Sequence, residues 1–176
     1  MRYDDFPPSR HPLVSYRPLE RSDAHAWYGY LALPEVFEHT SWNLASAGDL
    51  QPLFDAYEST DPDSQIRFAV IANADGRLVG TFGFHTISHT NRSAEIAFDL
   101  CPSVWGRGIA RSLCETALQW AFTRLNLVRV QAVVLETNLP SARTLEQSGF
   151  EREGYLRAYR QVRGRSGNFW MYSRLR

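Results

Sequence analysis

One segment near the middle of the chain restricts the fold more than any other. It reads EIAFDLCPSVWGRGIAR over residues 95–111, so a hydrophobic strand ending at Leu100 leads into a turn that holds Gly106 and Gly108. A long helical pattern starts directly after the turn, and a β-rich stretch follows it over residues 127–135. This order predicts a strand-to-helix crossover in the middle of a mixed α/β layer fold.

The periodicity of apolar residues gives the remaining elements. We expect strands over residues 13–17, 66–72, 77–86, 93–100, 127–135, 151–161 and 168–174. We expect helices over about residues 24–33, 47–57, 109–125 and 140–148, with Ser22 and Asp23 as the cap of the first. The order predicts a single domain over residues 13–176. Residues 1–12 carry three prolines and no periodicity, which indicates a loose, flexible arm.

Composition excludes several classes of protein. Hydrophobic residues make up 44% of the 176 residues, enough for a packed core, and 19 arginines balance 19 acidic residues. This balance gives no sign of a nucleic-acid partner. No apolar run approaches the roughly 20 residues of a membrane helix, and the N-terminus is unlike a signal peptide, so we expect a soluble, cytoplasmic protein. Cys101 and Cys114 are too few for a disulfide framework, and no metal-ligand spacing surrounds His85 or His89.

The glycine turn carries the first chemical hypothesis. Glycines let the backbone approach a ligand closely, and the free N–H groups at a helix start favour an anion. We therefore predict a pyrophosphate site over residues 106–111, to which Arg107 and Arg111 add charge. A tight strand–helix turn without a ligand is the alternative. The Walker and dinucleotide patterns are both absent, because no Gly-Lys-Ser/Thr and no third glycine follow.

A series of motifs extends this hypothesis to nearly the whole chain. They are RPLERSDA from Arg17, GRLVGTFGF from Gly76, AEIAFDL from Ala94, WGRGIA from Trp105, the N-x-x-S-A helix from Asn138, SGFEREG from Ser148 and the terminal YSRLR. In order and spacing the chain resembles the GNAT superfamily of N-acetyltransferases, and within it the branch of ribosomal-protein N-terminal (alanine/serine) acetyltransferases. The resemblance implies a central, mostly antiparallel sheet with one splayed parallel strand pair and flanking helices.

The resemblance also implies a binding mode for acetyl-CoA, in an opening between strands 93–100 and 127–135. Backbone groups of Phe98, Asp99 and Leu100 would hold the pantetheine arm, and an N–H near Leu100 would stabilise the oxyanion. Asn138 would bond either the pantetheine or the chain itself. Trp105 stands where the family pattern has Gln or Arg. The pyrophosphate would bind the segment formed by Trp105, Gly106, Arg107, Gly108, Ile109, Ala110 and Arg111.

Such enzymes let the amine attack the thioester directly, which agrees with the lack of a Cys-His or Ser-His-Asp arrangement. The amine must lose a proton, and the departing thiolate gains one. Glu95, beside the thioester position, and Glu153, after the SGF turn, are two candidates for the base. Ser141 matches a serine that faces the CoA sulfur in relatives. It is equally a good capping residue for the helix it begins.

For the acceptor, the resemblance points to aromatic residues of the first helical region and of the late strands. Phe37, Trp42 and Tyr155 are the candidate substrate-binding residues, with core packing as the alternative. The acceptor would be a primary amine, on a protein N-terminus or a small molecule. Succinyl-CoA or another acyl-CoA donor, and a non-catalytic acyl-CoA sensor or partner subunit, remain alternatives. The fold can form a homodimer through its terminal strands.

Overall fold

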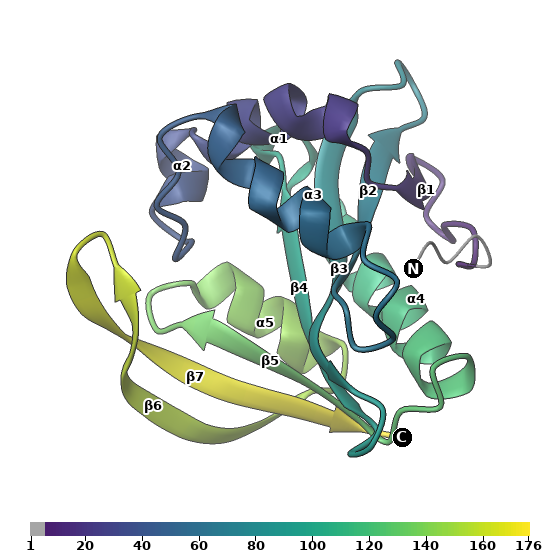
Figure 1. The fold of residues 1–176 in the computed structure, drawn as a ribbon, viewed down its shortest axis with the longest axis vertical. Helices are drawn as coiled ribbons and strands as arrows, with labels where there is room; N and C mark the ends of the chain where they lie inside the picture. Colours follow the sequence, from purple (N-terminus) through teal and green to yellow (C-terminus); the bar gives the residue numbers. More distant parts are fainter. Residues whose placement is uncertain (1–5) are drawn as a thin grey trace.

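A sheet of seven strands in the order β1-β2-β3-β4-β5-β7-β6 runs through the computed structural model, which describes residues 6–176 (Figure 1). All neighbouring strands are antiparallel except β4 and β5, which are parallel. The strands are β1 (Val14–Pro18), β2 (Ile66–Ala72), β3 (Leu78–Ser88), β4 (Ser93–Leu100), β5 (Arg129–Leu135), β6 (Glu151–Val162) and β7 (Arg165–Leu175). The predicted mixed α/β class, with a mostly antiparallel sheet and one parallel pair, is confirmed.

The α-helices are α1 (Ala24–Leu31), α2 (Pro34–Phe37), α3 (Gln51–Tyr57), α4 (Ile109–Thr123) and α5 (Leu139–Gln147). The short helix α2 is not among the helices that the sequence predicts, the first of which ends at about residue 33. Proline fits here because it occupies the first helical turn, where its missing N–H costs nothing. Asp23 occupies the N-cap position of α1 as predicted, but its carboxylate makes no capping bond to that helix and instead accepts from the Glu20 backbone N–H at 2.9 Å.

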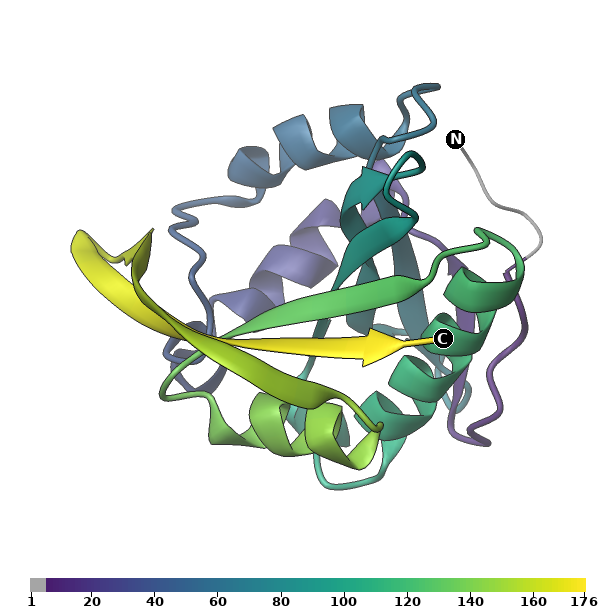
Figure 2. The ribbon, with the colours of Figure 1, turned by 90° about the horizontal axis from the view of Figure 1, so that it is seen from below.

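Adjacent residues of the central strands supply the two faces of the sheet. Phe68 of β2 belongs to a core that includes Leu113, Ala117 and Trp120 of α4. Its neighbour Ala69 belongs to a second core, which also contains Trp27 and Leu31 of α1 and Phe54 of α3. Since successive strand residues point to opposite faces, α4 and α5 cover one face of the sheet and α1 and α3 the other (Figure 2).

The start of the described chain is anchored to the first of these cores. Phe6 lies outside any helix or strand, yet its ring is 4.2 Å from that of Phe68 and 5.1 Å from that of Trp120. Phe6, a partly buried residue, thus gives the segment a contact with the core, while the flexibility expected of residues 1–12 stays a prediction. Residues 1–5 lie outside the described part.

Candidate active site

Strands β4 and β5 separate shortly after they meet. They pair only at Ser93 with Arg129, Ala94 with Val130 and Glu95 with Gln131. From there β5 continues beside β7, while β4 continues beside β3. The Cys101 N–H donates to Val79 of β3, so by strand alternation the backbone groups of Phe98 and Leu100 face the opening. The splayed pair expected from the sequence is thus present, with one free strand edge lining it.

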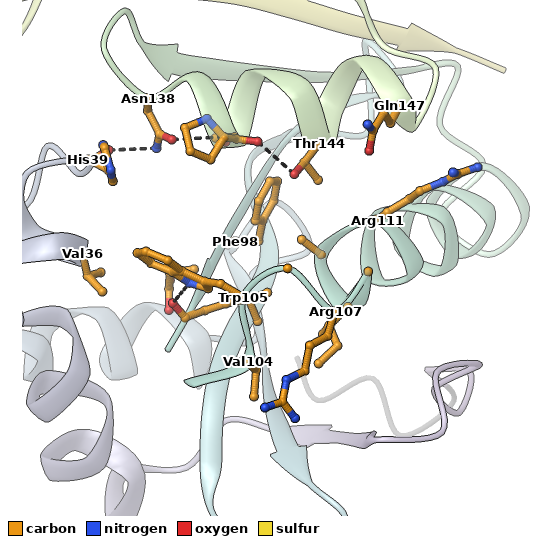
Figure 3. Close-up of a pocket in the computed structure, with 18 of the residues that line it drawn as sticks. Val36, His39, Phe98, Val104, Trp105, Arg107, Arg111, Asn138, Thr144 and Gln147 are labelled. Atoms are coloured by element: carbon orange, nitrogen blue, oxygen red, sulfur yellow. Dashed lines mark hydrogen bonds between the residues drawn. The ribbon is translucent and has the colours of Figure 1, made fainter. Parts of the chain in front are cut away.

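A cavity of about 400 Å³ lies at one end of this opening, and we call it the glycine-turn cavity (Figure 3). It is bounded by the end of β4, the turn before α4, the first residues of α4 and α5, and part of the segment after α2. All ten cofactor-binding candidates from Phe98 to Arg111 line it, as do Asn138 and Ser141. The segment that the sequence singled out for acetyl-CoA is therefore gathered around one hollow.

The glycine turn presents backbone donors to this cavity. Gly106 and Gly108 adopt φ of 71° and 78°, the left-handed region in which a side chain is strained. Gly108 is the N-cap of α4, and the first intrahelical bond closes from Ser112 N–H to Gly108 carbonyl at 3.1 Å. The N–H groups of residues 108–111 therefore have no partner within the helix and lie at its positive end. This is the arrangement that a pyrophosphate needs.

The two arginines of this segment both line the cavity, but their surroundings differ. Arg111 donates its Nε to Glu115 at 2.9 Å, one helical turn on, and its side chain is 57% exposed. The backbone carbonyl of Arg107 lies 2.9 Å from a His11 ring nitrogen. In Figure 3 the Arg107 side chain extends toward Val104, and Arg111 lies along α4. The charge that these two side chains would add to a bound pyrophosphate therefore stays a prediction.

Trp105 fixes the path of the turn. Its indole Nε1 donates to the Leu100 carbonyl at 2.7 Å, and the residue, which lines the cavity, stays 43% exposed (Figure 3). The Leu100 carbonyl is therefore occupied by the protein. The Leu100 N–H and the backbone groups of Phe98 remain directed at the opening for a bound molecule.

The start of α5 closes the opposite side of the cavity. The Asn138 side chain caps the helix by accepting from Ser141 N–H at 3.1 Å, and its Nδ2 donates to the His39 carbonyl at 3.0 Å (Figure 3). Capping is thus performed by Asn138 and not by the Ser141 side chain. In the described part of the chain the Ser141 hydroxyl has no hydrogen-bond partner, which leaves it available to a molecule in the cavity.

A second cavity, of about 320 Å³, lies beyond the first, and we call it the Glu95 cavity. The two cavities share His39, Thr40, Phe98, Asp99, Asn138 and Ser141. These six residues therefore mark the place where molecules in the two cavities would meet. Ser141 and the free edge of β4 both lie at this junction.

Glu95 is buried in the wall of the second cavity, with a side-chain exposure of only 4%. It accepts from Arg160 Nη2 at 3.1 Å and from Gln131 Nε2 at 3.4 Å, and His85 Nε2 lies 3.4 Å from it. Burial lowers the pKa of His85 below its ordinary value of 6.5, Arg67 and Arg160 lower it further, and Glu95 opposes them. His85 is therefore a neutral imidazole near pH 7, beside a buried carboxylate.

Asp99 contributes its backbone, and not its charge, to the cavities. Its carboxylate accepts from Trp27 Nε1 at 3.1 Å and from the Thr81 hydroxyl at 2.9 Å, and also bonds Tyr30 and the guanidinium of Arg67. Burial, followed by the Asp99 charge, raises the pKa of Tyr30 well above 10.0. These partners fix the side chain in the core and hold β4 in place below the opening.

Glu153, the second candidate base, lines neither cavity. Its carboxylate receives two hydrogen bonds from the Arg129 guanidinium, at 2.6 and 2.9 Å, and a third from the Ser173 hydroxyl at 2.6 Å. These bonds, that of Arg129 first, lower the pKa of Glu153 to about 2. The structure therefore separates Glu153 from Glu95 and holds it as an ion in a surface network.

Of the three predicted acceptor residues, only Trp42 lines the Glu95 cavity, where its ring packs 6.0 Å from that of Trp27. Phe37 lies under the guanidinium of Arg163, 4.9 Å from its ring, and lines neither cavity. The ring of Tyr155 packs 4.5 Å from that of Trp170 in a tilted arrangement, and its hydroxyl donates to Glu136, so Tyr155 also lines neither cavity. The sequence could not give the direction of these side chains, because each is set by a partner from another element.

Three residues of the site are absent from the sequence-based prediction. Two of them, His85 and Arg160, line the Glu95 cavity. His39 lines both cavities, and its buried Nδ1 has no hydrogen-bond partner in the described part of the chain. Only His85 carried a signal, since it lies on the strand next to Glu95 and pairs with it in register.

Within residues 6–176 no group of His, Cys, Asp or Glu is arranged to hold a metal ion. Among the helices of the described chain, none has the length and apolar content needed to cross a membrane.

Comparison with known proteins gives a consistent result. Residues 14–151 match the acetyltransferase (GNAT) domain family. An uncharacterized N-acetyltransferase p20 of Bacillus licheniformis is 31% identical over 93% of this chain and 93% of its own. Spermidine N(1)-acetyltransferase of Vibrio cholerae is 32% identical over 81% of this chain and 82% of its own.

Two solved structures show the same fold. A spermidine N-acetyltransferase from Vibrio cholerae in complex with CoA and spermine superposes with a TM-score of 0.80 at 26% identity, over 93% of this chain and 95% of that one. A ribosomal-protein-S5-alanine acetyltransferase from Vibrio fischeri superposes with a TM-score of 0.84 at 20% identity, over 96% of each chain.

Proposed function

The chain belongs to the GNAT family of acetyl-CoA-dependent N-acetyltransferases, and on this basis we propose that it transfers acetyl directly to a primary amine while both substrates are bound. The observation that carries the proposal is the junction of the two cavities. The glycine-turn cavity has the donors for a pyrophosphate, and the Glu95 cavity has a buried carboxylate. Phe98, Asn138 and Ser141 belong to both.

The residues of the glycine-turn cavity fit acetyl-CoA. The N–H groups of residues 108–111 would bind the pyrophosphate, and the free edge of β4 at Phe98 and Leu100 would bind the pantetheine amides. Bound acetyl-CoA supplies the thioester, whose C–S bond breaks as the new C–N bond forms. The Leu100 N–H would stabilise negative charge that develops on the carbonyl oxygen.

Two protons must move in this reaction, and the chain has a group for each. The attacking amine loses a proton, which we assign to Glu95, directly or through water. His85, neutral and 3.4 Å from Glu95, would pass that proton toward solvent. Ser141, with its hydroxyl unbonded in the described chain, would donate a proton to the departing thiolate. Glu153 has no part in this scheme, because its ion pair holds it away from both cavities.

The test is thiol release from acetyl-CoA against a panel of primary amines, for wild type and for Glu95→Gln, Glu153→Gln and Ser141→Ala. We expect release only when both substrates are present, with Glu95→Gln slowed by about 10²–10⁴-fold and Glu153→Gln near wild type. The chain contains no lysine, so release without an acceptor cannot come from acetylation of its own lysine side chains.

Each alternative gives a different result in the same assay. Faster turnover with succinyl-CoA than with acetyl-CoA would change the donor. Tight CoA binding without thiol release from any donor would support a sensor and reject catalysis. Parallel-line kinetics with an acetylated enzyme would reject direct attack.

A further inference from the structure

The Glu95 cavity is electrically balanced, although it would receive a cationic amine. Among the residues that line it, only Glu95 and Asp99 carry carboxylates. Asp99 is paired with Arg67, and Glu95 with Arg160 at 3.1 Å. Each carboxylate is therefore neutralised by an arginine of the same cavity, and the neutral His85 leaves this balance unchanged.

This balance is unfavourable for a polyamine. When one nitrogen of spermidine is deprotonated for attack, the other two nitrogens keep their positive charges. These two ammonium groups lose their hydration when they enter the cavity. A buried charge is stable only next to an opposite charge that is free to pair with it. The carboxylates that could pair with it here are already bound to arginines. The cavity thus fits poorly the substrate named for the spermidine acetyltransferase relatives.

Arg160 offers the opposite kind of site. In the described part of the chain its guanidinium makes one hydrogen bond, from Nη2 to Glu95, although it carries five N–H donors. The side chain is 37% exposed and lines the cavity, and the rings of Tyr159 and Phe169 lie 5.1 and 5.7 Å from its Cζ. The remaining donors form a planar edge that suits a carboxylate. Arg67 has no such edge, because its Nε, Nη1 and Nη2 bond Thr81, Ala97 and Asp99.

From these observations we infer that the acceptor is a free amino acid, whose carboxylate binds Arg160 while its amine faces Glu95. This inference rests on the proposed function. Since Arg160 Nη2 lies 3.1 Å from Glu95, the two groups of the substrate must be few bonds apart, as in an α- or β-amino acid. Peptide N-termini and polyamines, which have no carboxylate at this position, are excluded as preferred acceptors.

The experiment compares acids with their own amides. Thiol release from acetyl-CoA is measured with alanine and alaninamide, β-alanine and β-alaninamide, and spermidine. We expect kcat/KM for at least one acid to exceed that for its amide and for spermidine by about 10- to 100-fold, as a charge-assisted pair of hydrogen bonds would give. An amide group lowers the basicity of the neighbouring amine, so near neutral pH more of the amide substrate has its amine unprotonated and able to attack. Without binding by Arg160 the amide would therefore react faster, which makes a preference for the acid a strict test.

Variants then locate the effect. Arg160→Gln should reduce the acid-to-amide ratio to near one, while Arg160→Lys keeps charge and part of the ratio. Arg157→Gln is the matched control, since Arg157 lies exposed on the same strand and lines neither cavity. The ratio is the readout because loss of Arg160 also unpairs Glu95, which slows all acceptors alike.

Three outcomes would overturn the inference. Preference for spermidine or for an amide rejects the amino acid but leaves an acetyltransferase. An unchanged ratio in Arg160→Gln rejects the role of Arg160. Absence of release with every acceptor, with CoA bound, rejects the proposed function and this inference together.

Discussion

Arg163, at the tip of the hairpin between β6 and β7, donates its Nη1 to the carbonyl of Phe37, which lies 126 residues earlier. The same nitrogen donates to the Thr40 carbonyl at 3.0 Å, and Nη2 donates to that of Glu38 at 3.3 Å. One side chain thus fixes the segment that contributes His39, Thr40 and Trp42 to the Glu95 cavity.

Replacing Arg163 by Ala should therefore loosen this wall of the cavity. We expect KM for the acceptor to rise several-fold more than KM for acetyl-CoA, with a loss of about 1 kcal/mol in the free energy of unfolding. Steady-state kinetics and urea denaturation measure the two effects. Arg165→Ala is the control, since that side chain is exposed and makes no hydrogen bond or ion pair within residues 6–176. Equal effects of both variants would contradict the role of Arg163.

Asn138 allows its two bonds to be separated. Asn138→Ala removes both the cap of α5 and the bond to the His39 carbonyl, and should cost about 1 kcal/mol of stability. Asn138→Asp retains an oxygen for the Ser141 N–H but loses the donor to His39. It should keep near wild-type stability while raising KM for the acceptor. The comparison fails if Asp is as destabilising as Ala in thermal unfolding.

Gly108 and Gly29 form a second matched pair. An added methyl group meets no atom within 4 Å at either site, so crowding is excluded. Gly108 has a φ of 78°, and Gly108→Ala should cost about 1–2 kcal/mol and weaken CoA binding measured by calorimetry. Gly29, inside helix α1, should instead gain about 0.5–1 kcal/mol as Gly29→Ala, with CoA affinity unchanged. Loss of CoA affinity in Gly29→Ala would argue against a local effect at the turn.

Glu153 gives a prediction for acid stability. Its pKa is lowered from 4.5 to about 2 in the folded protein. The folded state therefore binds this proton more weakly than the unfolded state, so the stabilisation is complete above pH 4.5 and is lost as the pH falls toward 2. Because the carboxylate is 42% exposed, solvent screening limits the effect to about 1 kcal/mol or less.

Urea denaturation at pH 7 and pH 3 measures this contribution. Glu153→Gln should be less stable than wild type at pH 7, and the difference should shrink at pH 3. A difference that stays constant across this range would show that the ion pair with Arg129 contributes nothing.

The sequence predicted the fold well because local signals determined it. Strand alternation, the turn residues and the glycine–helix start gave each strand and long helix to within a few residues. The helix α2 was not predicted, because four residues are too few to show the periodicity of apolar residues that marks a helix. The packing of Phe6 was not predicted either, since a single aromatic residue in a proline-rich segment does not indicate that Phe68 and Trp120 will be its partners.

The sequence predicted the part of the site that one continuous segment of the chain forms. Residues 98–111 follow each other along the chain and line one cavity together. Arg160 and Glu95 are 65 residues apart, and their contact depends on how the fold brings β6 and β4 together. Tyr155 and Phe37 have the residue types of an acceptor pocket, but the pleat of β6 and the position of Arg163 turn them elsewhere. Such side-chain directions follow from tertiary packing, which a pattern of residue types does not contain.

The short contact between β4 and β5 divides the sheet into two parts, strands β1 to β4 and strands β5 to β7. Backbone pairing across this line covers only three residue pairs, whereas β5 and β7 pair over seven. The β4–β5 pair is therefore the shortest pairing in the sheet. It separates Glu95, on β4, from Ser141 and Arg160, which follow β5 in the chain. Across this line the Glu95 carboxylate is bonded by side chains, since it accepts from Arg160 Nη2 and from Gln131 Nε2. Beyond the three paired residues, the width of the opening therefore depends on side-chain contacts and core packing and not on strand pairing.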